Sequence, residues 1–251
     1  MSSDEKTVVV TGSGQGIGRA TAVELARRGY QVVIADLNAD HAASVADEIT
    51  STGGSALALA VDISDADSCR AASGELAGKV EKIDGLVNNA ALFSTLTMKP
   101  FWEIPEDEWN RVLQVNLTGT WRITKELLPL LRGSAAASIV NVAASAVWIG
   151  RPNYAHYVAS KAGVIGLTYA ISRELAGDGI RVNAVTPGSV QTEIPRHTIT
   201  PAQVQAQVDA QSVRRPAEPS DLVGAVAFLL GPDSGFISGQ TLNVDGGLTV
   251  R

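Results

Sequence analysis

The sequence predicts an α/β fold: a doubly wound sheet of seven parallel strands, flanked by helices on both faces, in a single domain. Short runs rich in β-branched residues alternate with longer segments in which apolar residues recur at helical spacing, as in βαβ units. Several strand candidates are apolar at nearly every position, which is typical of parallel strands covered on both faces. A length of 251 residues and a hydrophobic content of 45% suit one large core.

Seven strand candidates follow one another along the chain: 7–11, 31–35, 56–61, 84–89, 137–143, 180–185 and 241–244. Helix candidates lie between them: 16–28, 39–52, 65–80, 106–131, 155–176 and 219–230. Pro105 precedes the acidic start of the fourth helix, and "EPSD" precedes Leu222 in the last one, which is typical of helix N-termini. The alternation predicts that residues 1–251 form one domain.

The stretch 189–218 is the least regular part of the chain. It carries Pro195, Pro201 and Pro216 around a short helical run, "PAQVQAQVDAQ". Because it follows a strand of the predicted sheet, we expect a lid-like segment over the substrate. An ordinary surface excursion is the alternative.

Charge and composition exclude several classes of function. A formal net charge of −6 without a basic run disfavours nucleic acid and anionic membranes as partners and favours a small molecule. The lone Cys69 cannot form an internal disulfide, which suits a reducing, cytoplasmic setting. His41, His156 and His197 lack metal-ligand spacing, so no metal is predicted. The acidic N-terminus runs directly into a strand candidate and no apolar span of membrane length is present, so we expect a soluble protein.

The first chemical signal is the glycine-rich turn in "VVVTGSGQGIGRA", between the first strand and the first helix. Glycines there let the backbone approach a diphosphate, which free N–H groups and the positive end of the helix dipole then bind. Gly12, Gly14, Gly16 and Gly18 fit T-G-x-x-x-G-x-G, whereas the pattern G-x-G-x-x-G would need glycine at Ile17. Because it directly follows the first strand, the turn predicts a Rossmann-like nucleotide site.

Two aspartates end the next two strands. Asp36, in "VVIADLN", can accept hydrogen bonds from the adenosine ribose and would repel a 2′-phosphate, so it favours NAD over NADP. A turn-starting aspartate is the alternative at this position. Asp62, in "AVDIS", is within reach of an adenine amino group, or it simply caps the following helix.

Tyr157 and Lys161 stand four residues apart in a predicted helix, so their side chains are neighbours on one face. A lysine ammonium beside a phenol favours the phenolate and lowers its pKa from about 10 toward working pH. The tyrosine can then exchange a proton with an alcohol or ketone oxygen. Taken alone, this spacing also describes an ordinary pair on a helix surface.

Taken together, these motifs resemble the short-chain dehydrogenase/reductase family over nearly the whole chain. The matching segments, in order, are "TGSGQGIG", Asp62, "NNAA" (88–91), Asn116 in "VNLTG", "YVASK" (157–161), "RVNAVTPG" (181–188) and "NVDGG" (243–247).

The resemblance implies a role for each matching residue. Tyr157 is implied to be the general acid/base, Lys161 to hold the nicotinamide ribose and tune Tyr157, and Asn116 to maintain a water-linked proton path. With Tyr157 and Lys161, the residues implied to bind NAD are Gly12, Gln15, Gly16, Ile17, Gly18, Asp36, Asp62, Ile63, Asn89, Ala90, Pro187, Gly188, Val190 and Thr192.

The chain departs from the family pattern at one catalytic position. The family has a serine thirteen residues before the tyrosine, and Ala144 stands there, followed by Ser145. If the strand persists, Ser145 faces away from the substrate, whereas a loop could bring it into the site. Three explanations stay open: an introduced Ser-to-Ala change, a natural enzyme in which Ser145 or another donor replaces the serine, or a nucleotide-binding protein without turnover.

The substrate is expected to be small. Phe93, Trp148 and Tyr154 are candidate lining groups together with Ser145, and they favour an apolar, cyclic or aromatic secondary alcohol or ketone; ordinary packing is the alternative for each aromatic ring. No cluster of arginines is evident in the sequence, which disfavours a strongly anionic substrate.

We therefore predict an NAD-dependent oxidoreductase that interconverts a secondary alcohol and a ketone by hydride transfer. The resemblance also implies a homotetramer formed through helices 106–131 and 155–176. One alternative is a nucleotide-binding regulator that has lost turnover. Another is a dehydratase or epimerase on the same fold, for which 251 residues leave little room for an added substrate domain.

Overall fold

The computed structural model describes residues 5–195 and 200–250, and it confirms the predicted parallel sheet. The seven strands lie side by side in the order β3-β2-β1-β4-β5-β6-β7, and every pair of neighbours is parallel. Their bounds are β1 (Thr7–Thr11), β2 (Gln31–Asp36), β3 (Ser55–Ala60), β4 (Gly85–Asn88), β5 (Ser138–Val142), β6 (Arg181–Pro187) and β7 (Thr241–Val244).

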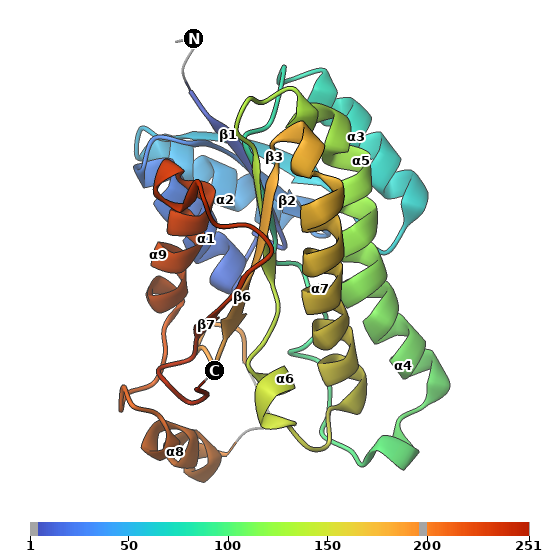
Figure 1. Ribbon diagram of the computed structural model, residues 1–251, viewed down its shortest axis with the longest axis vertical. Coiled ribbons are helices and arrows are strands. Elements are labelled where there is room, and N and C mark those ends of the chain that lie inside the picture. The colour runs from blue at the N-terminus through green and yellow to red at the C-terminus, as the bar shows by residue number, and fades with distance from the viewer. Residues whose placement is uncertain (1–4, 196–199, 251) are drawn as a thin grey trace.

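Helices cover the two faces of the sheet in separate layers (Figure 1). One layer holds α1 (Gly16–Arg27), α2 (Ala39–Ser51) and α9 (Pro219–Leu230). The other holds α3 (Ala66–Ala77), α5 (Thr120–Arg132) and α7 (Ala155–Glu174), with α4 (Glu106–Leu113) leading into α5. The short helices α6 (Ala146–Ile149) and α8 (Pro201–Ala210) lie beyond the carboxyl ends of the strands.

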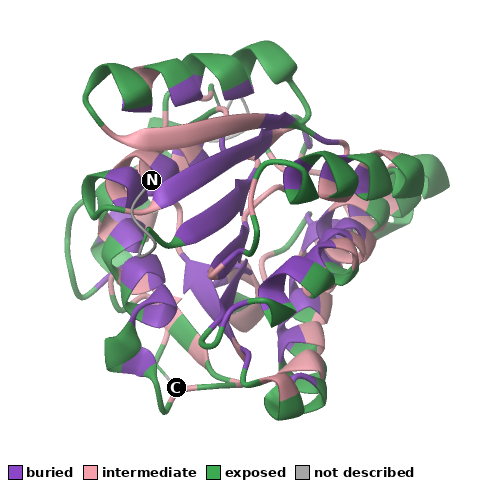
Figure 2. Cartoon of the chain, turned by 90° about the horizontal axis from the view of Figure 1, so that it is seen from above, coloured by how far each residue is buried: buried purple, intermediate pink, exposed green. Residues whose placement is uncertain are grey.

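Alternating side chains on each strand supply the two halves of the core. Val8 and Val10 pack on the layer of α1, α2 and α9, whereas Val9 packs on the layer of α3, α5 and α7. Strands covered in this way must be apolar at consecutive positions, which is why their sequences show runs and not alternation. Figure 2 shows the inner strands as the most continuously buried part of the molecule, whereas the edge strands β3 and β7 are mostly half-buried.

The sheet order reverses direction at its centre. From β1 the chain first adds β2 and β3 on one side, and then returns to place β4 on the other side of β1. Such a switch point leaves a crevice at the carboxyl ends of the two strands, where ligands bind in open α/β sheets. The glycine turn follows β1 and "NNAA" follows β4, so both flank this crevice.

One predicted helix is interrupted. The segment 106–131 was expected to be continuous, but a π-helical turn, η2 (Gln114–Gly119), separates α4 from α5. A π turn inserts an extra residue into the helix, and such turns are frequent at functional sites. Here the turn carries Asn116.

Candidate active site

A cavity of ≈ 580 Å³ lies at the carboxyl ends of the strands and gathers most of the predicted site residues. It extends from the loop after β2, past the glycine turn, to the first turns of α7. The predicted cofactor and catalytic residues that line it are Gly12, Gln15, Gly16, Ile17, Asp36, Asp62, Ile63, Asn89, Ala90, Ala144, Tyr157, Lys161, Pro187, Gly188 and Thr192.

The glycine turn is packed too closely to admit side chains. A Cβ on Gly12, whose φ is +63°, would lie 2.7 Å from Ala90 Cα, and a Cβ on Gly18 would lie 2.1 Å from the Gly12 carbonyl oxygen. Asn89 Nδ2 holds the turn by donating to the carbonyl oxygens of Thr11 and Gly12, each at 3.0 Å. Gly18 therefore supports the turn from behind and does not line the cavity, although it was predicted to bind the cofactor.

A nucleotide diphosphate fits this turn. The helix α1 begins at Gly16, and its N-cap residue, Gln15, makes no side-chain capping bond. No acidic residue of the helix itself lies in its first turn, and the positive end of its dipole faces the cavity. The carboxylate of Glu193, from a distant segment, accepts from Gly16 N at 2.7 Å. The turn therefore binds a negatively charged acceptor through a backbone N–H group, as a diphosphate requires.

The two aspartates are held in place by backbone groups. Asp36 Oδ2 accepts from Gly14 N at 2.8 Å, and Asp36 Oδ1 accepts from Asn38 N at 3.0 Å. Asp62 Oδ1 accepts from the backbone N and the hydroxyl of Ser64, so Asp62 caps its own turn as well as lining the cavity. Leu37 also lines the cavity and is 72% exposed, which gives this end an open apolar surface.

Tyr157 lies in a cluster of aromatic rings at the other end of the cavity. The centroid of the Phe93 ring is 4.5 Å from that of Tyr157 and 5.7 Å from that of Tyr154. Tyr154 is 1% exposed and does not line the cavity, so its predicted place among the substrate-lining groups is not what the structure shows. It packs behind the two rings that do line it.

Lys161 is buried one turn after Tyr157. Its Nζ donates to the carbonyl oxygen of Val142, the last residue of β5, at 2.7 Å. Burial lowers the pKa of Lys161 from 10.5 to about 8, because the charged ammonium loses solvation. The helix α7 thus places a lysine whose ammonium is less stable than that of an exposed lysine at the edge of the cavity.

Asn116 lies behind the cavity and not in its lining, and it joins three segments. Its Oδ1 accepts from Leu92 N at 2.7 Å, and its Nδ2 donates to Leu92 O and to the hydroxyl of Ser160. Ser160 in turn donates to the Tyr157 carbonyl at 2.7 Å. The π turn therefore ties the segment after β4 to the helix that carries Tyr157.

The structure shows whether the strand before Ser145 persists as far as that residue, on which its predicted place in the site depended. The strand β5 ends at Val142, and Ser145 has a helical backbone with φ −65° and ψ −15°. Ala144 and Ser145 both line the cavity, and Ala144 packs in the cluster that contains Tyr157. Although Ser145 N still donates to Pro187 O at 2.9 Å, as in a parallel ladder, its place in the lining puts Ser145 in the site.

Trp148, predicted to line the substrate pocket, and Val190, predicted to bind the cofactor, both lie outside the cavity lining. Trp148 does not line the cavity: its Nε1 donates to Asn243 Oδ1 at 3.0 Å, and its ring packs against the cluster of Ala143, Val164 and Ile165. Val190 is outside the lining as well, and it pairs with Ala217 instead. Residues 196–199, which include His197 and part of the lid-like segment, lie outside the described residues.

The cavity also includes residues that sequence reasoning did not select. Arg111 on α4 and Arg151 before α7 both line it. The sequence showed no cluster of arginines and therefore disfavoured an anionic substrate, but the folded chain brings two arginines to the cavity, so that argument no longer holds. The one signal available for Arg151 was its place between Ala144 and Tyr157. Other unpredicted lining residues are Ala35, Leu37, Asn38, His41, Val61, Ser64, Ala91, Leu92, Ser94, Gln114, Val115, Val142, Ala143, Ala146, Ile149, Ser189, Ile194, Gln207, Gln211 and Leu248.

Comparison with known proteins places the chain in a family. A family model described as "Enoyl-(Acyl carrier protein) reductase" matches residues 12–249. An uncharacterized oxidoreductase of Mycobacterium tuberculosis is 41% identical over 249 residues, covering 99% of each chain. The 3-oxoacyl-[acyl-carrier-protein] reductase FabG of Staphylococcus aureus is 34% identical over 245 residues, covering 97% of this chain and 98% of its own.

A solved structure agrees with these matches. The 3-ketoacyl-(acyl-carrier-protein) reductase of Brucella melitensis, complexed with NADH, superposes with a TM-score of 0.89 at 34% identity, covering 98% of each chain. The chain belongs to the short-chain dehydrogenase/reductase family. Within that family it is an NAD(P)-dependent oxidoreductase.

The part of the chain that the structure describes holds neither a candidate metal cluster nor a candidate membrane span. No group of three or more His, Cys, Asp or Glu residues there could hold a metal ion. Nor is any helix within residues 5–195 and 200–250 both long and apolar enough to span a membrane.

Proposed function

We propose that the chain interconverts a secondary alcohol and a ketone with NAD as cofactor. The observation that supports this most is the convergence of Tyr157, Lys161, the glycine turn and Asp36 on one cavity. These groups come from α7, the β1–α1 turn and the end of β2, and their joint placement suits a dinucleotide with a substrate beside it.

Each group has a distinct task in this proposal. Tyr157 takes the proton from the alcohol oxygen in oxidation and returns it to the ketone oxygen in reduction. Lys161, charged at neutral pH, stabilises the phenolate form of Tyr157, and Asn116 keeps α7 aligned with the segment after β4. A bound nicotinamide cofactor supplies the hydride acceptor or donor. The rings of Phe93 and Tyr157 offer an apolar surface to the substrate.

Ala144 leaves the position of the family serine without a hydroxyl, so the substrate oxygen needs another donor. Ser145 is our candidate because it lines the same cavity one residue later. A protein that binds nucleotide without turnover remains the alternative from a different class. Turnover separates the two, since both would bind the cofactor at the glycine turn.

A second substrate class has its own support. The relatives named above as acyl-carrier-protein reductases act on 3-oxoacyl groups by name, and Arg111 and Arg151 line the cavity of this chain. Guanidinium groups pair well with phosphate, so a 3-oxoacyl thioester on a phosphate-bearing carrier is the second candidate. Its reacting group is also a ketone.

The test is nicotinamide absorbance at 340 nm with simple ketones and a 3-oxoacyl thioester in the presence of NADH or NADPH, and with simple secondary alcohols in the presence of NAD⁺ or NADP⁺. Turnover of any ketone that is lost in Tyr157→Phe supports the proposal. NADH binding by calorimetry without turnover of any panel member favours the nucleotide-binding regulator. If the protein neither binds NADH nor turns over any panel member, both the oxidoreductase and the nucleotide-binding regulator are refuted.

Assembly and location stay proposals. We propose a homotetramer formed through the long helices, and Trp121 on α5 and Tyr169 on α7 support it, being 46% and 45% exposed in the single chain. Light scattering should give a mass four times the chain mass of 26.1 kDa, and a monomer would contradict it. The buried, unpaired thiol of Cys69 suits the cytoplasm as the proposed location.

A further inference from the structure

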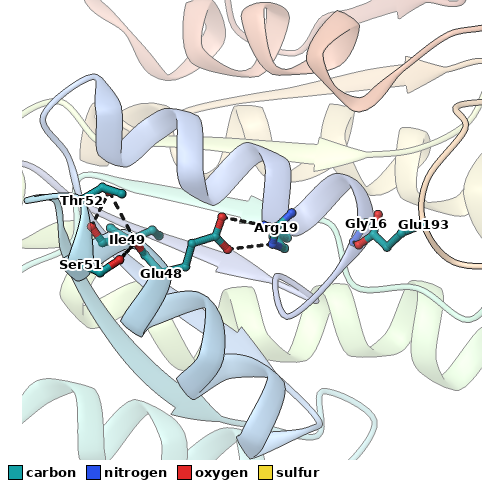
Figure 3. Close-up of polar contacts among 7 residues, drawn as sticks. All are labelled: Gly16, Arg19, Glu48, Ile49, Ser51, Thr52 and Glu193. Carbon is teal, nitrogen blue, oxygen red and sulfur yellow. Dashed lines mark hydrogen bonds and ion pairs between the residues drawn. The ribbon is translucent and has the colours of Figure 1, made fainter.

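The carboxylate of Glu193 lies at the first residue of α1. Gly16 N donates to Glu193 Oε1 at 2.7 Å, although the two residues are 177 positions apart in the sequence. Figure 3 shows Glu193 reaching the start of the helix from a separate segment of the chain. The contact brings a negative charge to the positive end of the α1 dipole.

This carboxylate satisfies a donor that the helix leaves open. Gln15 at the N-cap makes no side-chain bond, and the first turn of α1 has no acidic residue of its own. An N-terminal N–H without a local partner is free to donate a hydrogen bond to an anion. Glu193 supplies that anion from within the protein.

Gly16 N belongs to the glycine turn, where the proposed function places the cofactor diphosphate, and this inference rests on that proposal. Gly16 lines the cavity with Gln15 and Ile17, at the point where the glycine turn opens the helix. A carboxylate and a diphosphate cannot both accept from Gly16 N in the same direction, and their charges repel. One must leave for the other to bind.

The segment around Glu193 closes over the turn. Thr192 and Ile194 both line the cavity, and a Cβ built on Gly16 would lie 3.0 Å from Ile194 Cδ1 and 3.8 Å from Thr192 Cγ2. The segment is anchored just before this contact, since Gln191 N donates to Ala217 O at 2.7 Å. Glu193 is thus close to a fixed point, and a small movement beyond it releases the carboxylate.

We propose that Glu193 is an internal competitor for the cofactor diphosphate: it holds the segment 192–194 on the glycine turn in the nucleotide-free protein, and a dinucleotide displaces it. The apparent affinity for NADH is then the intrinsic affinity multiplied by the fraction of molecules in which Gly16 N is open. Removing the carboxylate raises that fraction and strengthens binding. Glu193 therefore sets cofactor affinity without being needed for it.

The experiment measures ligand binding by calorimetry with NADH, ADP-ribose and adenosine. Glu193→Gln keeps the shape of the side chain and removes its charge, and Glu193→Asp keeps the charge but shortens the reach by one methylene. Glu24→Gln, on the exposed side of the same helix, is the matched control. We expect both Glu193 variants to bind NADH and ADP-ribose roughly tenfold more tightly than the parent. Adenosine, which has no diphosphate, should bind all four proteins alike.

The outcomes separate this inference from the proposed function. Equal affinity of all four proteins for ADP-ribose would overturn the competition while leaving the nucleotide site intact. A gain in Glu193→Gln that is absent in Glu193→Asp would show long-range repulsion instead of the contact with Gly16, and would also overturn it. If neither NADH nor ADP-ribose binds any of the four proteins, the proposed cofactor site itself fails.

Discussion

The ring of Phe93 lies against the ring of Tyr157, with centroids 4.5 Å apart and planes tilted by 36°. Phe93 belongs to the segment after β4, whereas Tyr157 is in the first turn of α7. Asn116 connects the same two segments through its bonds to Leu92 and Ser160. Two independent contacts therefore set the position of the proposed acid/base relative to the strand edge.

Replacing Phe93 tests this arrangement. Phe93→Ala should lower kcat/KM by roughly tenfold, because an aromatic pair is worth up to about 1.5 kcal/mol beyond its buried area and the Tyr157 ring loses one wall. Steady-state kinetics on the best substrate from the panel gives the value. Phe101→Ala is the control, since Phe101 is 69% exposed and outside the cavity lining. Equal losses in both variants would mean that the contact with Tyr157 is not the cause.

Restoring the family serine should accelerate the reaction if no other hydroxyl has taken its place. Ala144 packs with Tyr157 and lines the cavity, so Ala144→Ser places a hydroxyl at the substrate side of the proposed acid/base. One positioned donor to a developing oxyanion is worth about 100-fold to 1000-fold in rate, and we expect a kcat gain of at least about 100-fold if that donor is missing. The measurement is NADH turnover by both proteins at saturating substrate.

Ser145 decides between the remaining explanations. If Ser145 replaces the missing hydroxyl, Ser145→Ala should lower kcat by about 100-fold while Ala144→Ser alone adds little. Full activity of Ser145→Ala would remove Ser145 from the mechanism. The bond from Ser145 N to Pro187 O at 2.9 Å is made by the backbone and is kept in the variant, and an unchanged Tm would exclude a general loss of stability as the cause.

The sheet was predictable because its physical cause is local. Strands covered on both faces need apolar side chains at consecutive positions, and each of the seven predicted runs overlaps a strand. The glycine turn was equally visible, since Gly12 has φ +63° and no room for a Cβ. Sequence spacing alone therefore located the cavity.

What the sequence did not predict depends on contacts between distant segments. The bond of Trp148 to Asn243 and that of Gly16 to Glu193 span 95 and 177 residues, and no local pattern encodes such pairs. The π turn at Asn116 is similar, because helix periodicity is too coarse to show one inserted residue. Only the folded chain shows which polar groups meet.

Asp36 should control the choice of cofactor. Its carboxylate lies at the end of β2, held by Gly14 N and Asn38 N, where the proposed site receives the adenosine ribose. Asp36→Ala removes the charge that would repel a 2′-phosphate, so the ratio of NADH to NADPH affinity should fall by at least about tenfold. Calorimetry with both cofactors measures the ratio. Asp40→Asn, an exposed change at the start of α2, should leave it unaltered.

The burial of Lys161 predicts how the free energy of unfolding changes with pH, which can be tested without substrate. Burial lowers its pKa to about 8, below the ordinary value of 10.5 that the unfolded chain retains. Between these two values the unfolded chain binds more protons than the folded one, so this lysine's contribution to stability becomes more favourable as pH rises. Below pH 8 both states are protonated, and the full desolvation cost of the buried ammonium is present.

Lys161→Met removes that pH-dependent cost. At pH 7 the burial cost corresponds to about 3 kcal/mol. The gain in the free energy of unfolding of Lys161→Met over the parent should therefore be larger at pH 7 than at higher pH. The difference should shrink by about 2 kcal/mol between pH 7 and pH 9.5, as the parent's lysine loses its proton in the folded state. Urea unfolding without cofactor measures it, and equal m-values confirm that both proteins lose the same structure. A difference that stays constant over this range would show that the ammonium at the Val142 carbonyl is not destabilised by burial.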